Sequence, residues 1–116
     1  MRSVLVVEDD RSIADTLRAM LEESYAVTVY EAPSAVPEPA GAHLVITDLL
    51  GGNGYDSRAA IDLVQELRAR TGAPVLVLTA HSAAKTDDRL AEVATAVLAK
   101  PFQMDELLAL VDRLIV

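Results

Sequence analysis

Five short apolar runs recur along the chain, and they constrain the fold more than any other feature of the sequence. The runs are rich in Val, Leu and Ile, and they lie at residues 3–7, 26–30, 44–47, 74–79 and 95–99. Most of them are apolar at every position, which is typical of parallel strands whose two faces are both covered. Alternation of such strands with helices predicts right-handed crossovers and helices on both faces of the sheet. The sequence therefore predicts an α/β fold with a five-stranded parallel sheet.

The segments between the runs indicate where the helices lie. Residues 11–23 carry four apolar side chains at helical spacing, namely Ile13, Leu17, Met20 and Leu21. By the same criterion we expect further helices at residues 58–70, 86–93 and 104–115. The link between the second and third runs differs, because three prolines within residues 33–39 exclude a full helix. We expect at most one helical turn there, at residues 34–36.

Bulk properties narrow the class of protein. The chain has 116 residues and 52% of them are hydrophobic, so we expect a single domain, residues 1–116, with its own core. A net charge of −8 argues against direct binding to nucleic acid. The absence of cysteine excludes disulfides and Cys-ligated metals. No apolar run is long enough to cross a membrane, so we expect no membrane segment and a cytoplasmic location.

Polar side chains collect where the predicted strands end. They follow or end strands one, three, four and five: Glu8, Asp9 and Asp10, then Asp48, Thr79 and Lys100. The carboxyl ends of parallel strands share one edge of the sheet, where ligands bind. Carboxylates gathered there repel one another unless they are protonated or neutralised. Mg²⁺ suits such a site, because it takes one or two carboxylates and keeps several waters.

The same edge contains the groups needed for phosphoryl transfer. A carboxylate such as Asp48 can act as the nucleophile. Lys100 can place a positive charge, and Thr79 a hydroxyl donor, near the phosphoryl oxygens. Each residue alone has an ordinary explanation, such as a favourable interaction with a helix dipole, a turn or strand propensity. Their conjunction at four strand ends favours a magnesium-dependent phosphoryl site.

Over essentially its whole length the sequence resembles response-regulator receiver domains. Four segments carry the resemblance: VLVVEDD at 4–10, LVITDL at 44–49, VLVLTA at 75–80 and LAKPF at 98–102. Each motif alone is weak, but four in this order are specific. The resemblance implies a flavodoxin-like, doubly wound parallel sheet with strand order 2-1-3-4-5. It implies that Asp48 is the phosphoacceptor, and that Mg²⁺ is held by Glu8, Asp9, Asp48 and the backbone carbonyl of Leu50.

The resemblance also implies how the site is used. Thr79 and Lys100 would bind the phosphoryl group, and the Lys100-Pro101 peptide bond would be cis. The donor would be a phosphohistidine on a sensor histidine kinase or a histidine phosphotransfer protein. The readout would be a rearranged surface formed by the helix at 86–93, the strand at 95–99 and the last helix. The protein would not be an enzyme, beyond accepting and losing its own phosphoryl group.

The sequence departs from the usual receiver pattern at four places. Val97 stands where the family usually has an aromatic switch residue, three positions before the lysine, here Lys100. The loop at 49–57 is longer than usual and lacks a proline, and Leu50 replaces a side chain that is often polar. The second helix is nearly lost. We therefore expect slow loss of phosphate unless His81 orients the attacking water.

We expect the last helix to carry apolar side chains that its packing on the sheet does not require. Met104, Leu108 and Ile115 extend the apolar surface of the last helix beyond one stripe, which indicates a contact with a partner or with a second copy of the chain on the readout surface. The sequence leaves open whether the domain stands alone or belongs to a longer regulator.

Three other functions fit parts of the pattern. A degenerate receiver, which binds partners without being phosphorylated, fits Val97 and the altered loop. A hydrolase of the haloacid dehalogenase type would need a second carboxylate where Leu50 stands. A flavodoxin-like cofactor binder would need a glycine- and hydroxyl-rich loop in place of the acidic residues 8–10. The phosphoacceptor receiver remains the favoured hypothesis.

Overall fold

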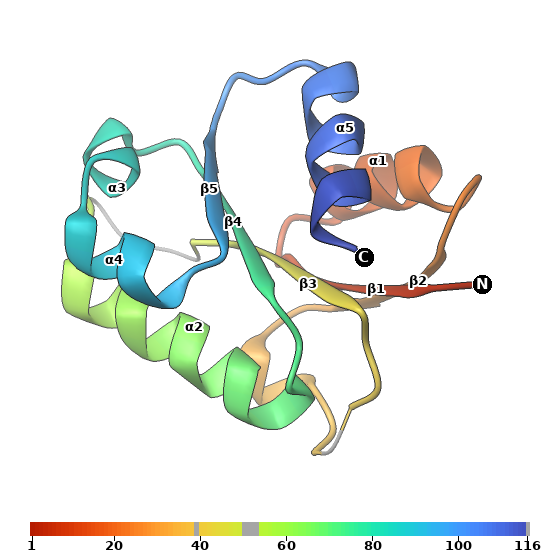
Figure 1. Ribbon diagram of the computed structural model, residues 1–116, viewed down its shortest axis with the longest axis horizontal. Coiled ribbons are helices and arrows are strands. Elements are labelled where there is room, and N and C mark those ends of the chain that lie inside the picture. Colours follow the sequence, from red (N-terminus) through yellow and green to blue (C-terminus); the bar gives the residue numbers. More distant parts are fainter. Residues whose placement is uncertain (39, 50–53, 116) are drawn as a thin grey trace.

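Five parallel strands form one sheet in the order β2-β1-β3-β4-β5 (Figure 1). The computed structural model describes residues 1–38, 40–49 and 54–115. The strands are β1 (Ser3–Val7), β2 (Ala26–Tyr30), β3 (Leu44–Asp48), β4 (Val75–Thr79) and β5 (Ala96–Ala99). The predicted α/β class and the strand order 2-1-3-4-5 are confirmed. β1 and β3 are neighbouring strands, and in their register Val6 lies opposite Ile46.

Helical segments fill the crossovers between these strands. They are α1 (Arg11–Leu21), η1 (Pro33–Ala35), α2 (Ser57–Thr71), α3 (Ser82–Lys85), α4 (Asp88–Val93) and α5 (Met104–Leu114). Aspartates cap the N-termini of α1 and α2. Asp10 accepts the N–H of Ile13 at 3.2 Å, and Asp56 accepts the N–H of Ala59 at 3.1 Å. Gly72 ends α2 in a left-handed conformation with φ 67°, which glycine adopts without strain.

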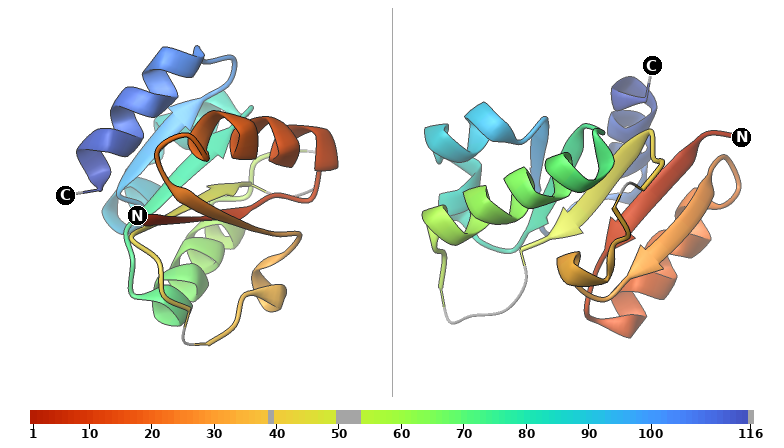
Figure 2. Two further views of the ribbon diagram at one scale, coloured as in Figure 1. Left: turned by 90° about the vertical axis from the view of Figure 1, so that its right-hand side faces the viewer. Right: turned by 90° about the horizontal axis from the view of Figure 1, so that it is seen from below.

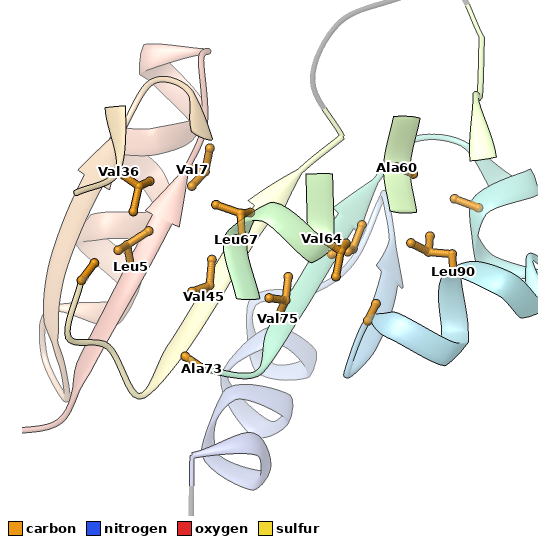
Figure 3. Packing of buried hydrophobic residues seen from close by; sticks show 14 residues of the cluster. Leu5, Val7, Val36, Val45, Ala60, Val64, Leu67, Ala73, Val75 and Leu90 are labelled. Atoms are coloured by element: carbon orange, nitrogen blue, oxygen red, sulfur yellow. The ribbon is translucent and has the colours of Figure 1, made fainter. Parts of the chain in front are cut away.

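The helices cover both faces of the sheet, as the apolar strands require. In Figure 2, α1 and α5 lie on one face, and α2 lies on the other. The α1–α5 face packs against alternate strand residues such as Val6 and Ile46. The opposite face packs Val64 and Leu67 of α2 on Val45 and Val75 (Figure 3). Burial of apolar area on both faces supplies the main stabilisation of the fold.

The second crossover confirms the expected loss of a helix. Its helical part is the single turn η1, which follows Ala32 and starts with a proline. Val36 is 1% exposed and packs with Ala40 into the core beside β1. These two side chains cover the part of the sheet that a full helix in this crossover would cover. Beside them a hollow of about 200 Å³ opens between β1, β2, Pro37 and residues 40–42.

Two expectations for the last third of the chain need correction. The helix expected at 86–93 begins at Asp88, and a separate short helix, α3, precedes it. Asp87 causes the break, because its side chain binds the free N–H groups of the next turn and competes with a continuous helix. Ile115 does not extend an exposed apolar surface, since it is 8% exposed and belongs to the core beneath α5. Met104 is 53% exposed and Leu108 is half-buried.

In the ranges 1–38, 40–49 and 54–115, no helix has the length and apolar character needed to cross a membrane.

Candidate functional site

The turn between β1 and α1 fixes the position of two acidic residues. Glu8 directly follows β1, and its N–H still donates to the carbonyl of Tyr30 on β2, at 2.9 Å. Its Oε2 accepts the N–H of Asp10 at 3.1 Å, while Asp10 caps α1. The next residue after Glu8, Asp9, is exposed. The local fold therefore buries one carboxylate at the sheet edge and leaves the other open to solvent.

Glu8 is the buried acid of this edge. Its side chain is 2% exposed, and among the residues that the structure describes, its Oε1 is a buried oxygen with no hydrogen-bond partner. Burial, followed by the neighbouring carboxyls of Asp48 and Asp9, raises the pKa of Glu8 from 4.5 to about 7, against the opposing effect of the Asp10 N–H. An unpaired buried oxygen beside other carboxylates is a position that a cation would satisfy.

Asp48 forms an ion pair across the sheet edge. It is the last residue of β3, and its Oδ2 lies 2.7 Å from Nζ of Lys100. Both side chains are largely buried, with exposed fractions of 16% for Asp48 and 24% for Lys100. The N–H of Lys100 donates to the carbonyl of Thr79 at 2.7 Å, which holds the end of β5 against β4. The implied cis Lys100-Pro101 bond is present.

Thr79 ends β4 next to this ion pair. In the register of the sheet, Asp48 lies opposite Leu78, so Thr79 stands one residue further towards the carboxyl edge. The threonine is fully buried, and its hydroxyl oxygen accepts the N–H of His81 at 3.0 Å. Among the hydrogen bonds of the described residues the Thr79 hydroxyl donates none, so its proton can serve an acceptor at this edge.

The structure thus brings together five of the six predicted site residues. We call this group the acceptor edge: Glu8, Asp9, Asp48, Thr79 and Lys100. The sixth, Leu50, lies outside the described residues, so its predicted carbonyl ligand is not placed. Within 1–38, 40–49 and 54–115, no three His, Cys, Asp or Glu side chains are arranged to hold a metal by themselves. Mg²⁺ needs fewer, since it keeps waters and takes one or two carboxylates.

A second group beside the acceptor edge was not predicted from the sequence. Tyr55 and Ser57 both donate to the carboxylate of Asp87, and the ring of Tyr55 lies against that of His81. Asp87 alone has a sequence signal, because an aspartate before a helical turn is a typical N-cap. Nothing in the periodicity pairs it with residues 30 positions earlier.

Comparison with known proteins assigns the family. A model of the response regulator receiver domain family matches residues 4–112. The chain belongs to this family. The match covers almost the whole sequence, and it confirms the resemblance drawn from the four motifs. Receiver domains of response regulators generally bind Mg²⁺ at their phosphorylation site, and in general they are not catalytic enzymes.

Several response regulators are similar to this receiver domain in sequence. Sensory transduction protein RegX3 of Mycobacterium tuberculosis is 34% identical over 119 residues, covering 94% of this chain and 48% of the relative. Regulatory protein VanRB of Enterococcus faecalis is 34% identical, covering 97% of this chain and 51% of the relative. The KDP operon transcriptional regulatory protein KdpE of Escherichia coli is 32% identical, covering 94% and 49%. The chain therefore spans about half the length of the curated relatives it matches.

Solved structures show the same architecture. The response regulator TrrA of Thermotoga maritima, in complex with Mg²⁺ and BeF, superimposes with a TM-score of 0.78 at 28% identity, covering 98% of this chain and 99% of that one. The non-phosphorylated HemR receiver domain of Leptospira biflexa has a TM-score of 0.76 at 30% identity, covering 99% and 94%.

Proposed function

We propose that residues 1–116 form a phosphoacceptor receiver domain of a two-component or phosphorelay system, with Asp48 as the acceptor. The observation that carries the proposal is the 2.7 Å pair between Lys100 and Asp48, beside a buried oxygen of Glu8 that has no hydrogen-bond partner among the described residues. A carboxylate nucleophile, a phosphate-binding cation and an unsatisfied acid are the parts that magnesium-dependent phosphoryl transfer to an aspartate needs.

The acceptor edge suits Mg²⁺ by its chemistry. Glu8, Asp9 and Asp48 are the side chains that would hold the ion, with the carbonyl of Leu50 as the fourth predicted protein ligand. Oxygen donors of this kind are those that Mg²⁺ prefers, and Oε1 of Glu8 has no other partner in the described part of the chain. Bound Mg²⁺ would neutralise charge on the carboxylates and on the phosphoryl oxygens.

The residues of the chain would then divide the transfer step between them. An oxygen of Asp48 attacks the phosphorus of a phosphohistidine, the new O–P bond forms as the N–P bond breaks, and the imidazole leaves. Lys100 already reaches the acceptor carboxylate, so its ammonium is placed to bind a phosphoryl oxygen added there. The Thr79 hydroxyl donates to no atom in the described part of the chain, so its proton would bind another oxygen of the same group.

The partners follow from this chemistry. The donor is a sensor histidine kinase or a histidine phosphotransfer protein, and the output surface is the face formed by α4, β5 and α5. Relatives carry the names of sensory and regulatory proteins, and the similar TrrA structure holds Mg²⁺ and BeF, which supports the proposal. A homodimer through this face rests on Met104 and Leu108, because Ile115 is buried. The cytoplasmic location stays a prediction.

A degenerate receiver is the second candidate. Val97 of β5 favours it, because its side chain has no polar atom with which to reach the hydroxyl of Thr79. Such a protein would dock on a partner through the same fold without accepting a phosphoryl group.

Fluoroberyllate binding distinguishes the two candidates. Amide NMR shifts are measured with fluoroberyllate and Mg²⁺ for the wild type and for Asp48→Asn. If the protein is a phosphoacceptor receiver, the amide signals of Thr79 and Lys100 shift only in the wild type and only with Mg²⁺. Shifts absent from both proteins would instead identify a degenerate receiver.

A further inference from the structure

Hydrogen bonds join the segment after β3 to the start of α4. The Tyr55 hydroxyl donates to Oδ2 of Asp87 at 2.6 Å, and the hydroxyl of Ser57, the first residue of α2, donates to the same oxygen at 2.5 Å. Oδ1 of Asp87 accepts the N–H groups of Arg89 and Leu90 at 3.0 and 3.4 Å, which caps α4. We call this group of bonds the Asp87 tie. One carboxylate therefore connects two preceding hydroxyls to the first turn of α4.

The tie is supported by packing and charge. The Tyr55 ring is half-buried against the core cluster that also holds the fully buried Leu90 of α4. Burial and the bond to Asp87 raise the pKa of Tyr55 to about 12. The hydroxyls of Ser57 and Tyr55 lower the pKa of Asp87 to about 2. At neutral pH the phenol keeps its proton and the carboxylate is charged, so the bond between them is charge-assisted.

A continuous set of contacts leads from the acceptor edge to this tie. The Thr79 hydroxyl oxygen accepts the N–H of His81, and the His81 and Tyr55 rings lie with centroids 6.2 Å apart at an angle of 41°. Aromatic rings at this separation are in favourable contact. Any turn of the Thr79 side chain towards a phosphoryl oxygen changes the bond to His81, whose ring rests on Tyr55.

The far end of α4 is held separately. Arg68 of α2 donates from a guanidinium nitrogen to the carbonyl of Val93, the last residue of α4, at 2.9 Å. Figure 1 shows the short helix α4 beside part of α2, and the two helices are in contact. With its last residue anchored by Arg68, α4 would respond to a displacement of Asp87 by tilting at its start.

We propose that Tyr55 is a positioning residue that couples the acceptor edge to α4 through His81 on one side and Asp87 on the other. The inference rests on the proposed function, since it assigns the route by which a phosphoryl group on Asp48 would reach the output face. Val97 on β5 carries no polar group for that purpose, whereas the Asp87 tie consists of directional bonds between elements far apart in sequence.

The chain offers a matched control for the test. The Tyr25 hydroxyl donates to Asp112 of α5, so it is a second tyrosine–aspartate bond, and it lies against the core on the opposite face of the sheet. Tyr55→Phe and Tyr25→Phe each remove one hydroxyl and keep the ring. Ser57→Ala tests the tie without altering any aromatic packing. Dispersed amide spectra of each variant establish that it is folded.

The experiment compares amide shifts on adding fluoroberyllate and Mg²⁺. In the wild type and in Tyr25→Phe we expect shifts at Thr79, at Lys100 and throughout residues 88–93. In Tyr55→Phe the shifts at Thr79 and Lys100 remain and those at residues 88–93 are lost. In Ser57→Ala the shifts at residues 88–93 are reduced. Unchanged α4 shifts in Tyr55→Phe, or no α4 response in the wild type, would overturn the coupling. Absence of shifts at Thr79 and Lys100 in the wild type would overturn the proposed function itself.

Discussion

Nζ of Lys100 lies 2.7 Å from Oδ2 of Asp48, although the two residues are 52 positions apart in the sequence. The pair links the ends of β3 and β5 across the intervening strand β4. It places one positive charge next to a group of carboxylates that would otherwise repel one another. Lys100 therefore competes with any cation at this edge while it stays ready to bind a phosphoryl oxygen.

The first prediction concerns removal of that charge. Lys100→Ala leaves Asp48 without its ion-pair partner, so we expect the metal-free protein to lose roughly 1–3 kcal/mol of unfolding free energy. Mg²⁺ should then stabilise the variant more than the wild type, because the competing ammonium is gone, while fluoroberyllate affinity falls. Chemical denaturation in EDTA and in Mg²⁺ measures the two changes in stability, and titration with fluoroberyllate measures the affinity. Lys85→Ala, which removes an exposed lysine of α3, is the control, and equal behaviour of the two variants would contradict the prediction.

The second prediction concerns the buried acid. Above the Glu8 pKa of about 7 the side chain is charged and buried, and within residues 1–38, 40–49 and 54–115 its Oε1 has no hydrogen-bond partner. Glu8→Gln removes that charge, so we expect the metal-free protein to gain about 1–3 kcal/mol of unfolding free energy. Stabilisation by Mg²⁺ should be largely lost in the same variant. Glu92→Gln, an exposed change on α4, should alter neither quantity. A variant that is less stable in EDTA and responds to Mg²⁺ like the wild type would show that Glu8 is not part of a metal site.

The third prediction concerns the pH dependence of the Asp87 tie. The folded-state pKa of Asp87 is lowered from 3.8 to about 2. A lowered pKa means that the stabilisation is present above 3.8 and is lost as the pH falls towards 2. Wild type should therefore lose more stability over that window than Asp87→Asn, which keeps a good capping residue. Thermal unfolding across the acid range measures the difference, and parallel curves would count against the tie.

The bond between Tyr55 and Asp87 also makes stability depend on pH in the alkaline range. Its pKa is raised from 10.0 to about 12, so its contribution is present below pH 10 and is lost as the pH rises through 12. Tyr55→Phe should remove this dependence and leave that of Tyr25, whose pKa is also raised to about 12.

Sequence reasoning found the parts of this protein that repeat or stand at strand ends. The alternation of apolar runs and helical spacing predicted the five strands within one residue at each end, because a buried parallel strand needs apolar side chains on both faces. The positions of Asp48, Thr79 and Lys100 followed from the rule that parallel strands end at one edge. Their roles in phosphoryl transfer were drawn from chemistry and resemblance, and they stay predictions.

The contacts between separate segments were not accessible in the same way. The Asp87 tie depends on two hydroxyls meeting a capping aspartate that periodicity does not connect to them. The break between α3 and α4 depends on the same side chain, whereas the pattern of Leu90 and Val93 suits one helix equally well. Burial of Ile115 depends on how α5 sits on the sheet, because the residue lies just beyond the helix, where helical spacing no longer decides its direction.

The last prediction concerns how long a phosphoryl group would survive on Asp48. Loss of the group requires a water aligned opposite the acceptor oxygen, and the side chain of Leu50 has no polar atom with which to orient that water. His81 stands two residues after Thr79, but its ring rests on Tyr55 and its N–H is bound to Thr79. We therefore expect slow decay in the wild type, a several-fold faster decay in Leu50→Asn, and a decay in His81→Ala that is no faster than in the wild type. Radiolabelled or mass-spectrometric decay curves after phosphorylation by a small-molecule donor measure the rate. Identical rates in all three proteins would show that neither position orients the water, and that the acceptor edge itself sets the lifetime.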